Sequence, residues 1–586
     1  MPFNVIGISA YFHDSACCLL QDGKVVAAAE EERFSRKKHD SSLPRLAFRY
    51  CLEAGGITIA DVDRVGYYEN PYKKLGRQIW MGLGGAPNGG EILSRLDARK
   101  PEREIREILG YEGAVEIVDH HHAHAASSFY FSGFPEAAIM TIDGVGEWAT
   151  ATFAAADGVN INIFEEVHFP DSIGLLYSAI TGYLGFSVND GEFKVMGLAP
   201  YGKPAYLDQI RTLIHSAPGG GFKLDLKYFD FHRRDRMYSD ELIALLGQVP
   251  RQRESDILQF HKDVARSLQV VLEEILIEKA TYLHGKVGSK NLCMAGGVAL
   301  NCVANSHVLN ESPFERLFVQ PASSDAGGAM GAAAVAHLRA TGRPVETAML
   351  KHAYLGPAFS SEEISALLDS TGLKAADYRG KESELLVATT EQLAAGKVVG
   401  WYHGRMEFGP RALGARSILA DPRDPGMRDR INALVKKREA FRPFAPAVLE
   451  SKARQHFDLD HLSPFMLETC QVNSPLDLPA ITHVDGSARV QTVSHEASPR
   501  FAALLEQFER QTGCPILLNT SFNMRGEPIV CTPLDAILCF VRSGIDALVL
   551  EDFLISRSDI KPAWSVICRG IEQHREAVSY QVYTLY

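Results

Sequence analysis

Short apolar runs separated by tight turns open the chain. Residues 3–9 (FNVIGIS) and 16–20 (ACCLL) have the length and character of buried strands, and a QDGK turn at 21–24 leads into VVAAAEEE. An Asp-Gly pair between apolar runs is a strong short-range signal for a β-hairpin. The pattern therefore predicts a strand followed by a hairpin that ends in acidic residues.

The same plan occurs a second time. Residues 137–143 (AAIMTID) form an apolar run that ends on a carboxylate, and they are followed by WATATFAAA, a turn at Asp157-Gly158 and VNINIFEEV. This weak repeat predicts a duplicated α/β core. It resembles the arrangement of actin, sugar kinases and heat-shock ATPases, in which two such halves face each other across a cleft.

Helical periodicity dominates the next part of the chain. We expect a helix from an N-cap at Ser255 to Gly285, with one buried stripe formed by Ile257, Phe260, Val264, Leu268, Val271 and Ile275. A strand, a double-glycine turn and a helix start are predicted at 291–305. Gly296 and Gly297 would let the backbone approach a ligand there, although such turns are as often only tight connections.

The pattern of the sequence changes near 340–360, where GRP and GP breaks precede a new helix at 361–372. We place a domain boundary near 355, which gives an N-terminal domain of residues 1–355 and a C-terminal domain of 356–586. Neither GxxxxGK[ST] nor GxGxxG after a strand is present, so the two common phosphate-loop motifs are missing.

Composition narrows the class of protein. The 586 residues are 46% hydrophobic and 23% charged, as in folded globular domains. No cleavable leader or membrane-spanning run is evident, so we expect a cytoplasmic protein without a membrane partner. The ten cysteines form no CxxC pair, which argues against a zinc ribbon.

Charge is unevenly distributed. The net charge of −12 argues against nucleic-acid binding. Residues 405–442 nevertheless carry eight Arg and two Lys against five acidic residues. One basic zone in an acidic chain predicts a discrete site for a small molecule that bears phosphate.

Two of the four histidines in VDHHHAHAAS (118–127), His120 and His124, are candidate metal ligands, whereas His121 and His122 point elsewhere. His120 and His124 are four residues apart, which places them on one helix face. A polar helix end with hydrogen-bonded histidines is the simpler explanation for such a pair alone. Asp143 ends a strand in IDGVGE, and Asp325 lies in QPASSDAGGAMGAA beside small residues that leave room for a ligand. Two His and two Asp suit Fe(II), Mn or Zn.

The basic zone contains a second candidate site. INALVKKREAFRPFAP clusters Lys436, Lys437, Arg438 and Arg442, and apolar residues interleave the charges, unlike a purely solvated helix face. Arg and Lys both bind phosphate, Arg in a bidentate manner. Ser521 and Asn523 follow an apolar strand at alternate positions and therefore share a side.

Several motifs together resemble the O-carbamoyltransferase family of antibiotic biosynthesis and nodulation-factor modification. They are YFHDSACCLL, EERFSRKKHD, DHHHAHAAS, IDGVGE, EFKVMGLAPYGKP, MAGGVALN, EFGPRALGARSILADPR and KKREAFRPFAP, and they cover nearly the whole chain. The resemblance implies that His120, His124, Asp143 and Asp325 bind Fe(II) or another divalent ion. It also implies an actin-like, RNase H-like first domain similar to the universal tRNA threonylcarbamoyl-transfer protein.

The resemblance implies a YrdC-like α/β fold for the second domain. Lys436, Arg438, Ser521 and Asn523 would hold ATP, accompanied by Mg²⁺, and an acyl phosphate. Further candidates for phosphate contact are Arg405, Arg411, Arg416, Arg442 and Arg489. Carbamoyl phosphate and ATP would give carbamoyl-adenylate and pyrophosphate in this domain.

A hydroxyl of a small-molecule acceptor would then attack the carbamoyl carbon in the first domain. His13 and Asp14 are the candidate proton acceptors, unless they only cap a turn, and Lys38 could orient the carbamoyl oxygen. The expected cleft residues are Asp190, Glu192, Lys194, Gly146, Glu147, Gly296, Gly297 and Asn301. Glycine and glutamate at 146–147 could contact the nucleotide or support the metal ligands.

Three rival functions are weaker. A hydrogenase-maturation carbamoyltransferase would need an acylphosphatase-like segment and CxxC zinc fingers. A tRNA threonylcarbamoyl enzyme would need a basic surface outside 405–442, and an actin-like ATP-binding scaffold would not need the four candidate ligands. The acceptor is not predicted, although segments 76–106 and 218–253 could line its pocket, and a homodimer is our expected assembly.

Overall fold

The computed structural model describes residues 2–81, 96–231, 236–346, 349–436, 439 and 441–564. The chain divides into two compact units. Of the described residues, the first unit contains the chain up to Glu31 together with His39–Leu350, and the second contains Glu32–Lys38 together with the chain from Lys351 to Trp564. This division lies a few residues before the predicted boundary at 355, and nothing in the sequence predicted that residues 32–38 would join the second unit.

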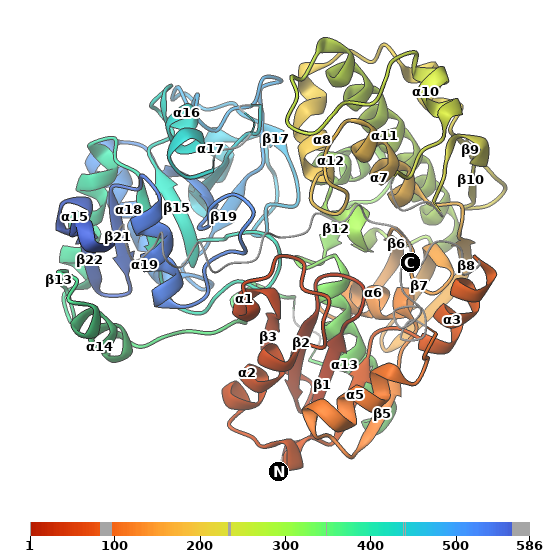
Figure 1. Cartoon of the computed structure of the whole chain (residues 1–586), viewed down its shortest axis with the longest axis horizontal. Coiled ribbons are helices and arrows are strands. Elements are labelled where there is room, and N and C mark those ends of the chain that lie inside the picture. Colours follow the sequence, from red (N-terminus) through yellow and green to blue (C-terminus); the bar gives the residue numbers. More distant parts are fainter. Residues whose placement is uncertain are drawn as a thin grey trace. The chain divides into compact units, whose positions relative to one another are not determined.

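A five-stranded sheet opens the first unit (Figure 1). Its strands are β1 (Asn4–Ser9), β2 (Ala16–Gln21), β3 (Lys24–Glu30), β4 (Arg64–Tyr67) and β5 (Ala114–Ile117), in the order β3-β2-β1-β4-β5. β1, β2 and β3 are antiparallel, whereas β4 and β5 run parallel to β1. The predicted hairpin turn is present, with Asp22 and Gly23 at φ 48° and 80°.

The second sheet repeats this topology. Its strands are β6 (Glu136–Ile142), β7 (Ala149–Asp157), β8 (Asn160–His168), β11 (Asn291–Ala295) and β12 (Arg316–Val319), in the order β12-β11-β6-β7-β8. Again three antiparallel strands are extended by two that run parallel to the first. The repeated order and strand direction confirm the predicted duplicated, actin-like fold class.

Two helices lie at the centre of this unit. α13 (Asp325–Thr341) packs against α6 (His120–Phe129) and against β1 and β2 (Figure 1). A methyl group on Gly331 would lie 1.8 Å from the Ala123 carbonyl oxygen, and one on Gly7 would lie 1.8 Å from the Ala329 oxygen. The small residues after Asp325 therefore allow close helix packing, and our interpretation that they leave room for a ligand is wrong.

The long helix was predicted with the wrong ends. α11 runs Gln259–Val287 and is followed by Gly288 in the left-handed conformation. At its start, the His261 side chain takes the place of Ser255 as the cap, because His261 Nδ1 accepts from the backbone N–H of Leu258. Ile257 precedes the helix, whereas the rest of the predicted stripe is buried. The other helices of this unit are α2 (Arg45–Gly55), α3 (Pro71–Trp80), α5 (Lys100–Leu109), α7 (Ile173–Tyr183), α8 (Glu192–Leu198), α9 (Leu207–Arg211), α10 (Asp240–Leu246) and α12 (Cys302–Glu311).

An eight-stranded mixed sheet forms the second unit, as expected for an α/β domain of the YrdC-like kind. Its strands are β13 (Ala376–Asp377), β22 (Phe553–Ser556), β21 (Ala547–Leu550), β14 (Val399–Tyr402), β15 (Arg416–Ala420), β20 (Ile516–Ser521), β16 (Ala445–Leu449) and β19 (Gln491–Val493), in that order. Its helices are α14 (Ser361–Thr371), α15 (Glu382–Ala394), α16 (Met427–Ile431), α17 (Glu450–His456), α18 (Pro499–Thr512) and α19 (Pro533–Arg542). No described helix has the length and apolar character needed to cross a bilayer.

Residues 32–38 are built into this second unit. α1 (Glu32–Ser35) begins the segment, and the Arg33 guanidinium donates to the Gly409 carbonyl at 2.8 Å. Arg36 donates to the carbonyls of Ile529 at 2.7 Å and Pro528 at 2.8 Å. Charge-assisted bonds to backbone carbonyls are among the stronger protein hydrogen bonds, so this short segment is firmly attached.

Candidate functional site

The start of α6 fixes the first two candidate ligands. One carboxylate oxygen of Glu147 accepts hydrogen bonds from the backbone N–H of His120 at 2.9 Å and of Asn70 at 2.6 Å. The free N–H groups at a helix start favour such an anionic partner. His120 and His124 are both buried, and their Nε2 atoms lie 3.1 Å apart.

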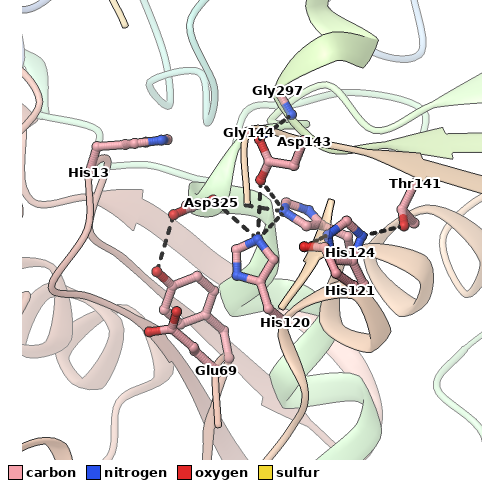
Figure 2. Close-up of polar contacts among 12 residues, drawn as sticks. His13, Glu69, His120, His121, His124, Thr141, Asp143, Gly144, Gly297 and Asp325 are labelled. Carbon is pink, nitrogen blue, oxygen red and sulfur yellow. Dashed lines mark hydrogen bonds and ion pairs between the residues drawn. The ribbon is translucent and has the colours of Figure 1, made fainter. Parts of the chain in front are cut away.

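Asp143 directs one oxygen at these two imidazoles. Its Oδ2 lies 3.1 Å from His120 Nε2 and 3.2 Å from His124 Nε2. Its Oδ1 accepts from the backbone N–H groups of Gly144 at 2.8 Å and Gly297 at 3.2 Å. These backbone bonds hold the carboxylate in the orientation that Figure 2 shows.

Asp325 completes the group from the first residue of α13. Its Oδ1 lies 3.7 Å from His120 Nε2 and 3.8 Å from His124 Nε2, and this atom is buried without a hydrogen-bond partner. Its Oδ2 accepts from the Tyr68 hydroxyl at 3.1 Å. A buried carboxylate oxygen without a partner is costly, and a cation would remove that cost.

The four side chains fit a divalent cation. Their nearest ligand atoms all lie within 4.8 Å of one another. Two ligands each about 2.1 Å from a shared ion lie roughly 3 to 4 Å apart, depending on their angle. A set of two imidazole nitrogens and two carboxylate oxygens suits Fe(II), Mn or Zn better than a soft metal.

The electrostatics of this cluster also favour positive charge. Burial by itself would lower the pKa of His120, but the nearby carboxylates of Asp325 and Asp143 raise it to about 9. Burial would raise the pKa of Asp143, and the two imidazoles outweigh it and hold that pKa well below its usual value. The cluster therefore stabilises either a proton or a metal cation.

His121 is not part of the cluster, as the helical spacing predicted. Its Nδ1 lies 2.7 Å from the Thr141 hydroxyl, and its Nε2 lies 2.9 Å from the Ala149 carbonyl oxygen. Burial and the neighbouring imidazoles hold its pKa well below 6.5. His121 is therefore a neutral core histidine.

His13 lies beside the cluster of two histidines and two aspartates (Figure 2). Its Nδ1 lies 3.1 Å from Asp14 Oδ2, and the other oxygen of Asp14 lies 2.7 Å from His39 Nδ1. Burial lowers the pKa of His13, but Asp325 and Asp14 outweigh it and raise the pKa to about 9. The structure thus brings two of the three predicted catalytic residues to the cluster, whereas Lys38 belongs to the second unit.

The remaining predicted cleft residues lie in two groups. Gly146 packs on His120, because a methyl group there would lie 2.8 Å from the His120 ring. Gly296, at φ 94°, has no room for a side chain beside the Ile142 carbonyl oxygen at 2.2 Å. Asn301 caps α12 through the Ala304 N–H at 3.0 Å.

Residues 190–194 follow a different pattern. Asp190 lies 3.6 Å from His39 Nε2, and Glu192 accepts from the Ser178 hydroxyl at 2.8 Å. The Lys194 ammonium lies 5.7 Å from the centre of the Phe186 ring. Asp190 is therefore the member of this group that is connected with the residues around His13.

In the second unit, predicted phosphate contacts meet at one edge of the sheet. β15 begins at Arg416 beside the end of β20 at Ser521, and the Ser521 hydroxyl donates to Asn523 Oδ1 at 2.7 Å. Arg442 and Arg489 are half-buried. Arg438 and the Lys436 side chain lie outside the described residues.

Arg416 is engaged with backbone. Its buried guanidinium donates to the carbonyls of His403 at 3.2 Å, Gly404 at 3.0 Å and Pro357 at 3.0 Å, and stacks 3.6 Å from the centre of the Tyr402 ring. Arg405 likewise donates to the Leu355 carbonyl at 2.6 Å. The structure shows both arginines holding loops, and their contact with phosphate stays a prediction.

Sequence reasoning missed a charged cluster at the same edge. His403 Nδ1 lies 2.6 Å from Glu551, at the adjacent ends of the parallel strands β14 and β21. Arg500 lies 3.0 Å from Asp552 and 2.8 Å from Glu382. These residues are far apart in the chain and share no motif, so only the sheet pairing could have joined them.

Comparisons with known proteins identify the family of the chain. A family model described as Carbamoyltransferase N-terminus matches residues 4–77 and 105–334, and one described as Carbamoyltransferase C-terminus matches 390–557. Nodulation protein NolNO of Sinorhizobium fredii is 37% identical over 98% of this chain and 84% of its own length. Nodulation protein NolO of Bradyrhizobium diazoefficiens is 39% identical over 78% and 82%.

Similarity to solved structures is much lower. Component A of (R)-2-hydroxyglutaryl-CoA dehydratase from Acidaminococcus fermentans shares 15% identity, with a TM-score of 0.31 over 58% of this chain and 99% of that one. The fold class therefore rests on the strand order within each sheet.

Proposed function

Because the chain belongs to the carbamoyltransferase family, we propose that it transfers the carbamoyl group of carbamoyl phosphate to a hydroxyl of a small natural product, by way of carbamoyl-adenylate and at the expense of ATP. The observation that carries this proposal is the convergence of His120, His124, Asp143 and Asp325 in the first unit, with His13 beside them. That group joins a cation site to a proton acceptor, as carbamoyl transfer to an alcohol requires.

The four ligands would hold one divalent cation, which the family resemblance gives as Fe(II). Such a cation, when bound, supplies Lewis acidity that polarises a carbonyl oxygen. The hydrogen bonds of Gly144, Gly297 and Tyr68 fix the carboxylates of Asp143 and Asp325 in place. The protein therefore provides a rigid, negatively charged set of ligands.

The second unit would form the activated carbamate. Hydrolysis of carbamoyl phosphate releases phosphate and leaves carbamate, whose oxygen attacks the α-phosphorus of MgATP and expels pyrophosphate. Ser521, Asn523, Arg442 and Arg489, with Lys436 and Arg438, are our candidates to hold the phosphates. Their fixed donors would stabilise charge that moves from one phosphate to the next.

In the transfer step, the acceptor hydroxyl attacks the carbamoyl carbon and AMP leaves. The hydroxyl proton passes to Nε2 of neutral His13, whose Nδ1 side is occupied by Asp14. Because the pKa of His13 is raised to about 9, the population of this neutral form increases as the pH rises toward 9. A general base of this kind contributes about 10²- to 10⁴-fold to the rate. His13 in turn gives the proton to solvent or to the departing phosphate.

The test is an assay of the purified full-length protein with ATP, Mg²⁺ and labelled carbamoyl phosphate. We expect pyrophosphate release that depends on carbamoyl phosphate, and labelled carbamate ester when a hydroxylated acceptor is added from a panel of natural products. ATP hydrolysis at the same rate with and without carbamoyl phosphate would instead favour an actin-like ATP-binding scaffold.

A further inference from the structure

We propose that His39 is a positioning residue that acts through Asp14 to hold His13 in the tautomer that accepts the hydroxyl proton. The inference rests on the proposed carbamoyl transfer, in which His13 is the base. His39 follows the segment of residues 32–38 and belongs to the first unit, as do His13 and Asp14.

The carboxylate of Asp14 joins the two imidazoles. Its Oδ2 lies 3.1 Å from His13 Nδ1, and its Oδ1 lies 2.7 Å from His39 Nδ1. An ionised carboxylate can only accept hydrogen bonds, so both rings must present Nδ1–H to it. The nitrogen of neutral His13 that keeps its lone pair is therefore Nε2.

A second carboxylate faces the opposite edge of the His39 ring. Asp190 Oδ1 lies 3.6 Å from His39 Nε2. His39 is thus placed between two carboxylates, Asp14 and Asp190, which fixes the plane of its ring. A fixed His39 holds Asp14 in turn, because a carboxylate with a partner on each oxygen has little freedom to rotate.

The backbone of this region is strained in a way that supports the same geometry. Tyr11, Asp14, His39 and Asn189 have φ values of 71°, 50°, 54° and 66°. Each such residue costs energy, and they are retained mainly where function requires their geometry. The loop that carries Asp14 and the loop that carries His39 are also joined by backbone hydrogen bonds. These run from Tyr11 N–H to the Ser41 carbonyl at 2.8 Å and from Ser15 N–H to the Asp40 carbonyl at 3.0 Å.

The test compares two nucleophiles on the full-length, metal-loaded protein supplied with ATP and carbamoyl phosphate. In aqueous glycerol, AMP formation reports attack by a hydroxyl group, from glycerol or from water, and this attack needs a base. With hydroxylamine the products are hydroxyurea and AMP. Neutral hydroxylamine is a strong nucleophile, so it depends much less on a protein base.

We expect His39→Leu to lower kcat for hydroxyl-dependent AMP formation about 10- to 100-fold, with KM for carbamoyl phosphate and ATP unchanged. Hydroxyurea formation and pyrophosphate release should stay within about twofold of the wild type. His39→Asn should recover most of the loss, because its amide N–H can still donate to Asp14. In the Asp14→Asn background, His39→Leu should cause no further loss.

The matched control is His168→Leu, since His168 is an exposed histidine of the same unit that pairs with Glu166 at 2.7 Å. It should leave both reactions unchanged. Equal loss with both nucleophiles, unchanged hydroxyl transfer, or additive effects of the His39 and Asp14 substitutions would each overturn the proposal. Failure of the proposed function is distinct, because the wild type would then release no pyrophosphate in response to carbamoyl phosphate.

Discussion

His120 and His124 show how much the surroundings of a residue decide its chemistry. Both lie one turn apart on α6, as does many a pair of core histidines. Here two carboxylates face them, and the Nδ1 atoms have no protein hydrogen-bond partner. His121, on the next position of the same helix, has partners on both nitrogens and stays neutral. The partners of each ring, and not its residue type, separate a candidate ligand from a core residue.

Removing one imidazole should abolish metal binding. We expect His124→Ala to lower the metal content of the purified protein from about one ion per chain to nearly none, because three ligands in a buried site leave an open position. The measurement is elemental analysis of the dialysed protein. His122→Ala, a half-buried histidine of the same helix, is the control and should keep its metal. A metal-replete His124→Ala protein would contradict the assignment.

The raised pKa of His120 gives a pH prediction. Its pKa is about 9 in the metal-free fold against 6.5 when unfolded. The stabilisation from its charged form is therefore complete below about pH 6.5 and is lost as the pH rises through about 9, a change on the order of 1–3 kcal/mol. Thermal unfolding of chelator-treated protein should show a Tm that falls over this interval.

Metal-loaded protein should not show this fall in Tm. A metal binds the neutral imidazole, so its affinity rises with pH over the same interval and protons are released on binding. We expect the Tm of the loaded protein to change little between these pH values. Parallel Tm curves with and without metal would contradict this coupling.

At the scale of elements, the geometry of the cluster depends on where four elements begin or end. β6 ends just before Asp143, α6 starts at His120, α13 starts at Asp325, and the turn after β11 supplies the Gly297 N–H. Close packing of α13 on α6 fixes the separation between the imidazoles and Asp325. The glycines at these contacts are thus part of the site, although they bind nothing themselves.

Gly146→Ala tests this dependence. The added methyl group would lie 2.8 Å from the His120 ring, so the ring or the turn must move. We expect at least about a tenfold loss of metal affinity, measured by competition with a chromophoric chelator, in a protein that remains folded. Gly285→Ala, where a methyl group meets nothing within 4 Å, is the control and should leave affinity unchanged. Unaltered affinity in Gly146→Ala would show that the turn adapts.

At the scale of the whole molecule, the described part of the chain passes between the two units three times, around residues 31–32, 38–39 and 350–351. The excursion of residues 32–38 is unusual because so short a segment has no core of its own. It is held by the guanidinium groups of Arg33 and Arg36 on backbone carbonyls of the second unit. The second unit therefore includes residues that precede most of the first unit in the chain.

Arg36→Ala should destabilise the second unit. Its loss leaves the carbonyls of Pro528 and Ile529 without their charged donor, at a cost of about 1–3 kcal/mol. We expect earlier unfolding in urea with unchanged metal content, since the four metal ligands belong to the first unit. Lys37→Ala, at an exposed position, is the control. Equal stability of the two variants would contradict the role of Arg36.

The sequence was sufficient for features with a local physical cause. Tight Asp-Gly turns and apolar runs predicted both hairpins, helical spacing paired His120 with His124, and alternate strand positions paired Ser521 with Asn523. The sequence was misleading where a second residue or a second role could explain the same local pattern. Ser255 is a good cap, yet His261 caps the helix instead, and small residues after Asp325 serve packing rather than a ligand.

Other features could be decided only by the tertiary structure. The joining of residues 32–38 to the second unit, the link from His39 through Asp14 to His13, and the pairing of His403 with Glu551 all depend on which distant segments become neighbours. Such contacts leave no periodicity, because each partner is fixed by its own local structure and only the packing of sheets and helices brings the two together. By itself the sequence determined which elements form and which residue types could bind a cation; the fold decided which side chains meet, since distance and orientation arise only when separate elements pack.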